Sequence, residues 1–194
     1  MIIDIHTHNP QTHAQTIDCV GIHPWHSPTG DIASVESAAS TADAIGEIGL
    51  DFACDVGCET QIGVFQAQLA IAERLQKPVV LHCVRAFEYV MKMLQKHHLP
   101  AVIFHGFIGS LQQAETILKR GYYLSFGERS LRSPKTRQAI DATPLDRLFC
   151  ETDDNASLNI ADIYTEVAEI KGVALAELER NIYENYKRLF RINE

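Results

Sequence analysis

The stretch IIDIHTHN, residues 2–9, begins as an apolar run and ends in two histidines spaced two residues apart. An apolar run of this length, rich in isoleucine, is typical of a buried β-strand. Because side chains alternate along a strand, His6 and His8 share one face, and a rise of about 3.3 Å per residue brings both imidazoles within reach of one ion. Asp4 lies on the same face. The stretch therefore predicts a strand that ends in two potential metal ligands.

The composition is that of an ordinary globular protein. The chain has 194 residues, of which 46% are hydrophobic and 22% charged. These values exclude a disordered or fibrous protein, and no linker or low-complexity segment divides residues 1–194, so we expect one domain. The first residues contain no apolar core of a signal peptide, and no 18 apolar residues run together, so we expect a cytoplasmic protein without membrane contact.

Charge and cysteine content limit the possible binding partners. The formal net charge of -8 gives no general attraction for nucleic acid, so binding to a nucleic acid would depend on local cations or metal ions. The five cysteines are an odd number scattered through apolar stretches, which favours reduced thiols that pack in the core. Cys54 and Cys58 lack a second cysteine pair, which argues against a zinc site there.

Short apolar runs alternate with segments of helical periodicity, a pattern that predicts repeated βα units and an α/β fold with a parallel sheet. Seven runs are expected to form strands, at residues 2–6, 19–23, 44–50, 78–82, 101–105, 122–126 and 147–151. Helices are expected at residues 61–75, 86–96, 111–120, 160–171 and 175–190.

Polar residues fall at the ends of nearly all these strands. In a (β/α) barrel the carboxyl ends of the strands form the rim that carries the active site. A single histidine in such a place is more often a core or loop residue, but an ordered set of imidazoles and carboxylates from six strands predicts a metal site. The set consists of His6, His8, His23, Glu47, His82, His105, Glu151 and Asp153.

Six motifs resemble the TatD family of metal-dependent nucleases, within the wider group of metal-dependent hydrolases that have a TIM barrel. They are IIDIHTH at 2–8, GIHPW at 21–25, AIGEIGLD at 44–51, KPVVLHC at 77–83, VIFHGF at 102–107 and ETDDN at 151–155. The resemblance covers nearly the whole chain. It implies a TIM-type (β/α) barrel.

The resemblance also implies a set of metal ligands. His6, His8, Glu47 and Asp153 would hold one divalent ion, and Glu47 would bridge to a second ion that His82 and His105 also bind. Imidazole and carboxylate ligands suit Zn, Mn or Mg, and two ions about 3.5 to 4 Å apart can activate a water for attack on phosphorus. Asp153 and Glu47 are the expected catalytic residues, with Asp153 orienting the nucleophile or taking its proton.

Other residues are weaker candidates. His23 could contact the substrate or support a ligand, and Arg85 could approach a substrate phosphate. Trp25 could stack on a base or cap the barrel by packing. Glu151 could act in catalysis or accept a hydrogen bond from a ligand, and Asp51 could bind a group that orients a ligand. A basic stretch after the sixth expected strand could meet a nucleic-acid backbone or form a solvated helix face, with Arg129, Arg132, Lys135 and Arg137.

One segment departs from the family pattern. Only ten residues separate His8 from Cys19, whereas a parallel crossover needs about a dozen or more. A βα unit is therefore expected to be missing, which predicts a seven-stranded or incompletely closed barrel. The shorter wall could be covered by a second subunit.

The leading functional hypothesis is a metal-dependent hydrolase of phosphodiester bonds, a deoxyribonuclease of the TatD type that acts on nucleic acid or another phosphoester. One alternative is a metal-dependent esterase or deacylase, for instance on aminoacyl-tRNA. Amide chemistry is disfavoured because related amidohydrolases often bridge their metals with a carbamylated lysine on the fourth strand, whereas the resemblance implies Glu47 as the bridge here. The other alternative is a metal-binding protein without turnover, which a complete ligand set argues against.

Overall fold

The computed structural model describes residues 1–190, and these form two compact units. Unit 1 combines Met1–Ile17 with the chain from Phe104 onward, and unit 2 is Asp18–Ile103. Each unit has parallel strands with helices packed against them. The expectation of a single domain over residues 1–194 stays a prediction.

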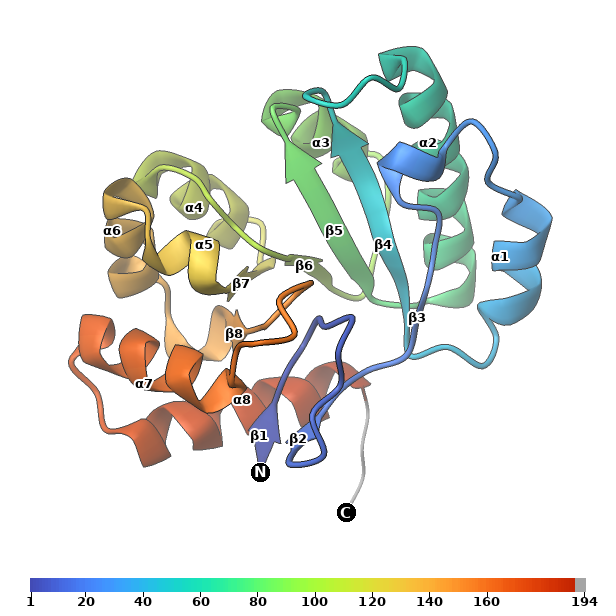
Figure 1. Ribbon diagram of the computed structural model, residues 1–194. Helices are drawn as coiled ribbons and strands as arrows, with labels where there is room; N and C mark the ends of the chain where they lie inside the picture. The colour runs from blue at the N-terminus through green and yellow to red at the C-terminus, as the bar shows by residue number, and fades with distance from the viewer. Residues whose placement is uncertain (191–194) are drawn as a thin grey trace. The chain divides into compact units, whose positions relative to one another are not determined.

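Unit 2 is built on three parallel strands. Cys19 of β3 pairs with Ala44 of β4, and Ile45 of β4 pairs with Val79 of β5. In Figure 1, α2 runs alongside β4 and α1 lies against α2. The elements in chain order are β3 (Cys19–Val20), the 3-10 helix η1 (Pro24–His26), α1 (Ile32–Ala38), β4 (Ala44–Asp51), α2 (Cys58–Leu75), β5 (Val79–Val84), α3 (Phe87–Leu94) and the start of β6 (Val102–Phe104).

The core of unit 2 lies between α2 and the strands. Phe65, Leu69 and Ala72 recur on one face of α2 with helical spacing, and all three are fully buried. Most of β4 is buried as well, as expected for a strand of a parallel sheet that is covered by helices. The burial of the apolar residues of β4 holds the carboxyl end of the strand in place.

Unit 1 brings the first strand of the chain beside the last. The amide of Ile5 donates to the carbonyl of Cys150 at 3.1 Å, and Leu148 of β8 pairs in parallel with Leu124 of β7. Such neighbours are what a (β/α) barrel requires of its first and last strands. The elements are β1 (Ile2–Ile3), β2 (Ala14–Gln15), α4 (Leu111–Leu118), β7 (Tyr123–Phe126), α5 (Glu128–Leu131), α6 (Pro134–Ala142), the 3-10 helix η2 (Leu145–Arg147), β8 (Leu148–Cys150), α7 (Ile160–Lys171) and α8 (Leu175–Phe190).

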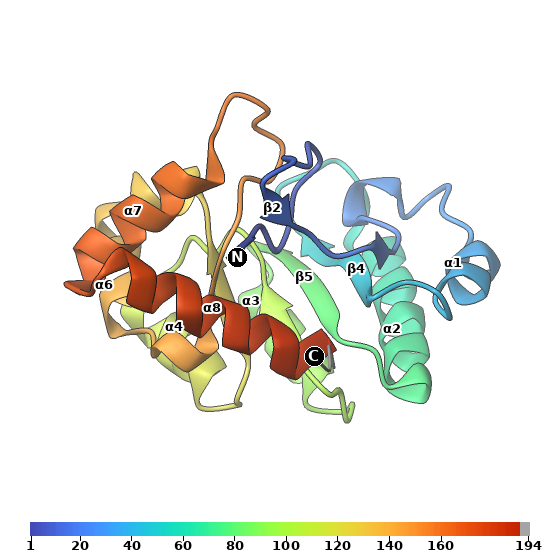
Figure 2. The same ribbon diagram turned by 90° about the horizontal axis from the view of Figure 1, so that it is seen from below.

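The helices of unit 1 fix β1. Figure 2 shows α7 and α8 side by side, and α8 also packs against β1. The buried hydroxyl of Tyr164 in α7 accepts from the amide of Ile3 at 3.1 Å and donates to the carbonyl of Ile3 at 2.8 Å. These two hydrogen bonds satisfy both the amide and the carbonyl of Ile3. They support β1, which is only two residues long.

The short segment after His8 contains a strand that the sequence analysis did not predict. Ala14 and Gln15 form β2, which pairs in parallel with Ile2 and Ile3 of β1. Residues 9–18 contain no helix, as expected from their length. Residues 1–190 therefore have eight strands rather than seven, because a two-residue strand flanked by polar residues leaves no periodic signal.

Candidate metal centre

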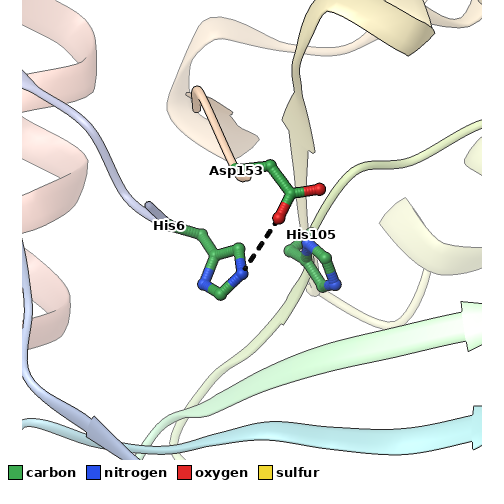
Figure 3. A group of neighbouring side chains, drawn as sticks. All are labelled: His6, His105 and Asp153. Atoms are coloured by element: carbon green, nitrogen blue, oxygen red, sulfur yellow. Dashed lines mark ion pairs between the residues drawn. The ribbon is translucent and has the colours of Figure 1, made fainter. Parts of the chain in front are cut away.

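Three potential metal ligands meet in unit 1. The ligating atoms of His6, His105 and Asp153 all lie within 4.8 Å of one another, and Figure 3 shows the three side chains turned toward one another. Nε2 of His6 is 3.5 Å from Oδ1 of Asp153, and the rings of His6 and His105 have centroids 4.4 Å apart. Both imidazoles are at least nine-tenths buried. Two imidazoles and a carboxylate are a donor set suited to a divalent transition metal.

Main-chain pairing aligns the two segments that carry this group. The amide of Asp153 donates to the carbonyl of His6 at 3.1 Å, and the amide of His8 donates to the carbonyl of Asp153 at 2.9 Å. The backbone of Asp153 has φ 56°. Residues other than glycine rarely adopt this left-handed conformation outside functional sites and turns. His8 lies farther out, since its side chain is 58% exposed and its Nε2 is 3.9 Å from Oδ1 of Asp153.

A buried network lies beneath the unit 1 group. Asp4 is fully buried and accepts hydrogen bonds from the amide of Thr152 at 3.0 Å and from its hydroxyl at 2.6 Å. Burial, only partly offset by these two hydrogen bonds, raises the pKa of Asp4 to about 6. Asp4 thereby ties the residue before Asp153 to the segment that carries His6.

The contacts of Glu151 show whether the group of His6, His105 and Asp153 suits a bound cation. Its Oε1 lies 3.3 Å from Nδ1 of His105. Its Oε2 is buried and has no hydrogen-bond partner among the described residues. A buried carboxylate with an unpaired oxygen is costly unless positive charge lies nearby. The residues therefore fit a bound metal cation. Glu151 would contact Nδ1 of His105 and leave its Nε2 to face the metal.

A second group of potential ligands lies within unit 2. The ligating atoms of His23, Glu47 and His82 are within 4.8 Å of one another. Oε1 of Glu47 is 3.0 Å from Nδ1 of His82 and 3.4 Å from Nε2 of His23. The side chains are only 11% to 16% exposed. His23, expected from the sequence to contact the substrate or support a ligand, lies directly against Glu47.

An irregularity in β4 positions these side chains. The register of β4 against β5 shifts between Ile45 and Ile48, a bulge of the kind that redirects side chains next to active sites. Gly49 pairs with His82 and has φ 146°, and a Cβ on it would lie 1.9 Å from the carbonyl oxygen of His82. Only glycine permits this close approach of β4 to the residue that carries the imidazole.

Asp51, a weaker candidate from the sequence, contacts both His82 and Trp25 in unit 2. Its Oδ2 is 3.3 Å from Nε2 of His82 and accepts from Nε1 of Trp25 at 2.7 Å. Burial raises the pKa of the Asp51 carboxyl, but hydrogen bonds from Trp25, the Ala53 amide and His82 together outweigh burial, so the pKa lies below its usual value. The alternation of side chains along β4 puts Asp51 on the face of Glu47, which was the signal available in the sequence.

The remaining candidates lie at the periphery. Arg85 is exposed, directly follows β5 and has φ 51°. In the basic stretch, which forms α5 and α6, Arg129 pairs with Asp154, Arg132 with Glu128, and Arg137 with Glu166. These ion pairs favour a solvated helix face over a nucleic-acid surface.

Residues 4–191 match the protein family described as "TatD related DNase". The chain belongs to the TatD family. It is 34% identical to the uncharacterized metal-dependent hydrolase YabD of Bacillus subtilis, over 90% of this chain and 77% of that protein. It is 36% identical to the 3'-5' ssDNA/RNA exonuclease TatD of Salmonella typhimurium, over 69% of this chain and 55% of that protein.

A solved structure confirms the fold class. The TatD homologue YjjV of Escherichia coli superposes with a TM-score of 0.82 and 28% identity, over 94% of this chain and 79% of that one. The α/β fold is thus of the TIM-barrel type, and the chain is a metal-dependent hydrolase of the TatD family. Among the described residues, no helix combines the length and the apolar character that crossing a membrane requires.

Proposed function

We propose that the chain hydrolyses phosphodiester bonds in single-stranded DNA with the aid of two divalent cations. The ligands would be those that the family resemblance implies, His6, His8, Glu47, His82, His105 and Asp153. The observation that carries the proposal is the convergence of His6, His105 and Asp153, with the unpaired buried oxygen of Glu151 behind His105. That arrangement supports a strongly held cation on the chemical grounds given above.

Asp153, Glu47 and Arg85 would have different roles in hydrolysis. When bound, the cations would lower the pKa of water and neutralise charge on the phosphoryl oxygens. The side chain of Asp153 is 29% exposed, so it can accept a proton from an attacking water and release it to solvent. Glu47 holds the imidazoles of His23 and His82 in fixed orientation through its Oε1. Arg85, exposed after β5, would bind a substrate phosphate.

The name of one relative favours nucleic acid as the substrate class. The Salmonella relative is named for exonuclease action on single-stranded DNA and RNA. The net charge of -8 gives no general attraction for a polyanion, so such a substrate would be held through bound cations and local arginines. A cytoplasmic location, and an oligomer formed at residues 9–18, stay predictions.

A substrate panel tests the proposal. Metal-loaded protein is incubated with single-stranded DNA, RNA, a small phosphodiester and an aminoacyl ester, each with and without chelator. We expect metal-dependent release of nucleotides from DNA, abolished by chelator and reduced at least a hundredfold by Glu47→Gln. Faster cleavage of the aminoacyl ester would favour the deacylase alternative. Metal binding without cleavage of any substrate would overturn the proposal and favour a metal-binding protein without turnover.

A further inference from the structure

Trp25 combines high exposure with a fixed position. It is the single tryptophan of the chain and is 55% exposed. Both ends of the residue are nevertheless hydrogen bonded: its amide donates to Nδ1 of His23 at 3.2 Å, and its Nε1 donates to Oδ2 of Asp51 at 2.7 Å. A tryptophan that merely caps the core would bury most of its ring. Here the polar edge is anchored, and much of the residue stays open to solvent.

The anchor of this indole is itself rigid. Asp51 is 4% exposed, and its other carboxylate oxygen accepts from the amide of Ala53 at 2.9 Å. The buried amide of Gln61 holds the main chain of Asp51 on both sides, with two hydrogen bonds of 2.8 Å. The indole orientation is therefore set before any ligand arrives, which lowers the entropy lost when a flat ligand binds to it.

The indole lies next to the ligand group of unit 2. Its ring centroid is 4.7 Å from that of His23, at an interplanar angle of 84°, and 6.4 Å from that of His82, at 73°. Both imidazoles therefore stand at steep angles to the indole plane and do not stack on it face to face. The indole is positioned to hold a group that is attached to a phosphate at a cation that Glu47 and His82 would hold.

We propose that Trp25 is a stacking platform for a nucleobase next to the scissile phosphate, an inference that rests on the proposed function. A nucleobase is flat and apolar on its faces, and stacking on an aromatic ring is indifferent to base identity. Both faces of a base inside a duplex are already covered by its neighbours, so the platform selects single-stranded substrate. Trp25 contributes to substrate binding, while the ligand residues contribute to the chemistry.

Two substitutions separate stacking from the hydrogen bond to Asp51. Trp25→Phe and Trp25→Leu both remove the Nε1 donor, but only Phe keeps an aromatic face. We expect Trp25→Leu to raise KM for single-stranded DNA about five- to a hundredfold relative to Trp25→Phe, with kcat changed less than threefold. The difference should vanish on an oligonucleotide that is abasic next to the cleaved bond. Equal KM values for the two variants on the normal substrate would overturn the proposal.

The intrinsic fluorescence of Trp25 gives a readout that needs no turnover. The protein, loaded with a divalent cation, is titrated with a single-stranded phosphorothioate oligonucleotide, which resists cleavage, and with a matched abasic one. We expect saturable quenching by the normal strand and at least fivefold weaker binding of the abasic strand. Quenching without metal-dependent cleavage would support the platform and contradict the proposed function. Cleavage by the metal-loaded protein without quenching would contradict the platform alone.

Discussion

Nδ1 of His105 lies 3.3 Å from Oε1 of Glu151, and both side chains are more than nine-tenths buried. A carboxylate in this position keeps the proton on Nδ1 and leaves Nε2 as the acceptor nitrogen. The imidazole is therefore prepared to use Nε2 as a ligand. Glu151 contributes to metal binding through His105, without needing to touch the metal.

The first prediction concerns this pair. Glu151→Gln removes the charge but keeps the shape of the side chain. Nδ1 of His105 therefore loses its charged acceptor, and a bound metal cation loses a nearby negative charge. We expect the affinity for Zn²⁺ to fall about tenfold to a hundredfold, measured by competition with a chromophoric chelator. Glu166→Gln, at an exposed ion pair of unit 1, is the control and should bind as the unchanged protein does. Equal affinities for all three proteins would contradict the role of Glu151.

The second prediction concerns Asp4 and pH. Burial raises its pKa to about 6 from the usual 3.8, so the folded state favours the protonated carboxyl. The associated stabilisation is fully present below about pH 4 and is lost as the pH rises through 6. The free energy of unfolding of the metal-free protein, relative to Asp4→Asn, should therefore fall by up to about 3 kcal/mol between pH 4 and pH 8. Urea denaturation in chelator measures the difference, and a difference that stays constant or rises with pH would refute this account of Asp4.

The third prediction concerns the thiols. Burial raises the pKa of Cys19 and of Cys83 to about 12 and that of Cys150 well above its usual value, so these thiols carry almost no reactive thiolate at neutral pH. Cys58 is exposed and Cys54 is half-buried. Brief treatment of the native protein with a thiol reagent at pH 7.5 should label at most these last two. Mass spectrometry gives the count, and we expect five labels after denaturation. Native labelling of Cys150 would show that the packing around β8 is incorrect.

The sequence predicted the elements that have a long periodic signal. The bounds of α7 and α8 agree with those expected, because twelve or more residues of helical spacing are bounded by clear signals, such as the Asn159 cap and Gly172 in the left-handed conformation. The short helices α1, α5 and α6 were not predicted. α1 and α5 span seven and four residues, too few for a recognisable apolar face. α6 spans nine residues but is mostly polar, with Thr136, Ala139 and Ile140 as its buried residues.

The site was predictable in its residue types and not in its supporting contacts. Strand-end histidines and carboxylates follow from the alternation of side chains and the parallel sheet. The hydrogen bond from Thr152 to Asp4 joins residues 148 positions apart, and no local sequence pattern predicts such a contact. The contact of His23 with Glu47 lies at the β4 bulge, and the left-handed Asp153 pairs through its main chain with His6 and His8. Both depend on neighbours that are distant in sequence.

The most direct test of the central claim compares two adjacent carboxylates. Asp153 belongs to the unit 1 ligand group, whereas Asp154 is 65% exposed and faces Arg129. Release of nucleotides from an end-labelled single-stranded DNA is measured with Mn²⁺ for the unchanged protein, Asp153→Asn and Asp154→Asn. We expect Asp153→Asn to be at least a thousandfold slower and Asp154→Asn to be within twofold of the unchanged protein. Equal rates for all three, or no metal-dependent release at all, would contradict metal-dependent phosphodiester hydrolysis by this site.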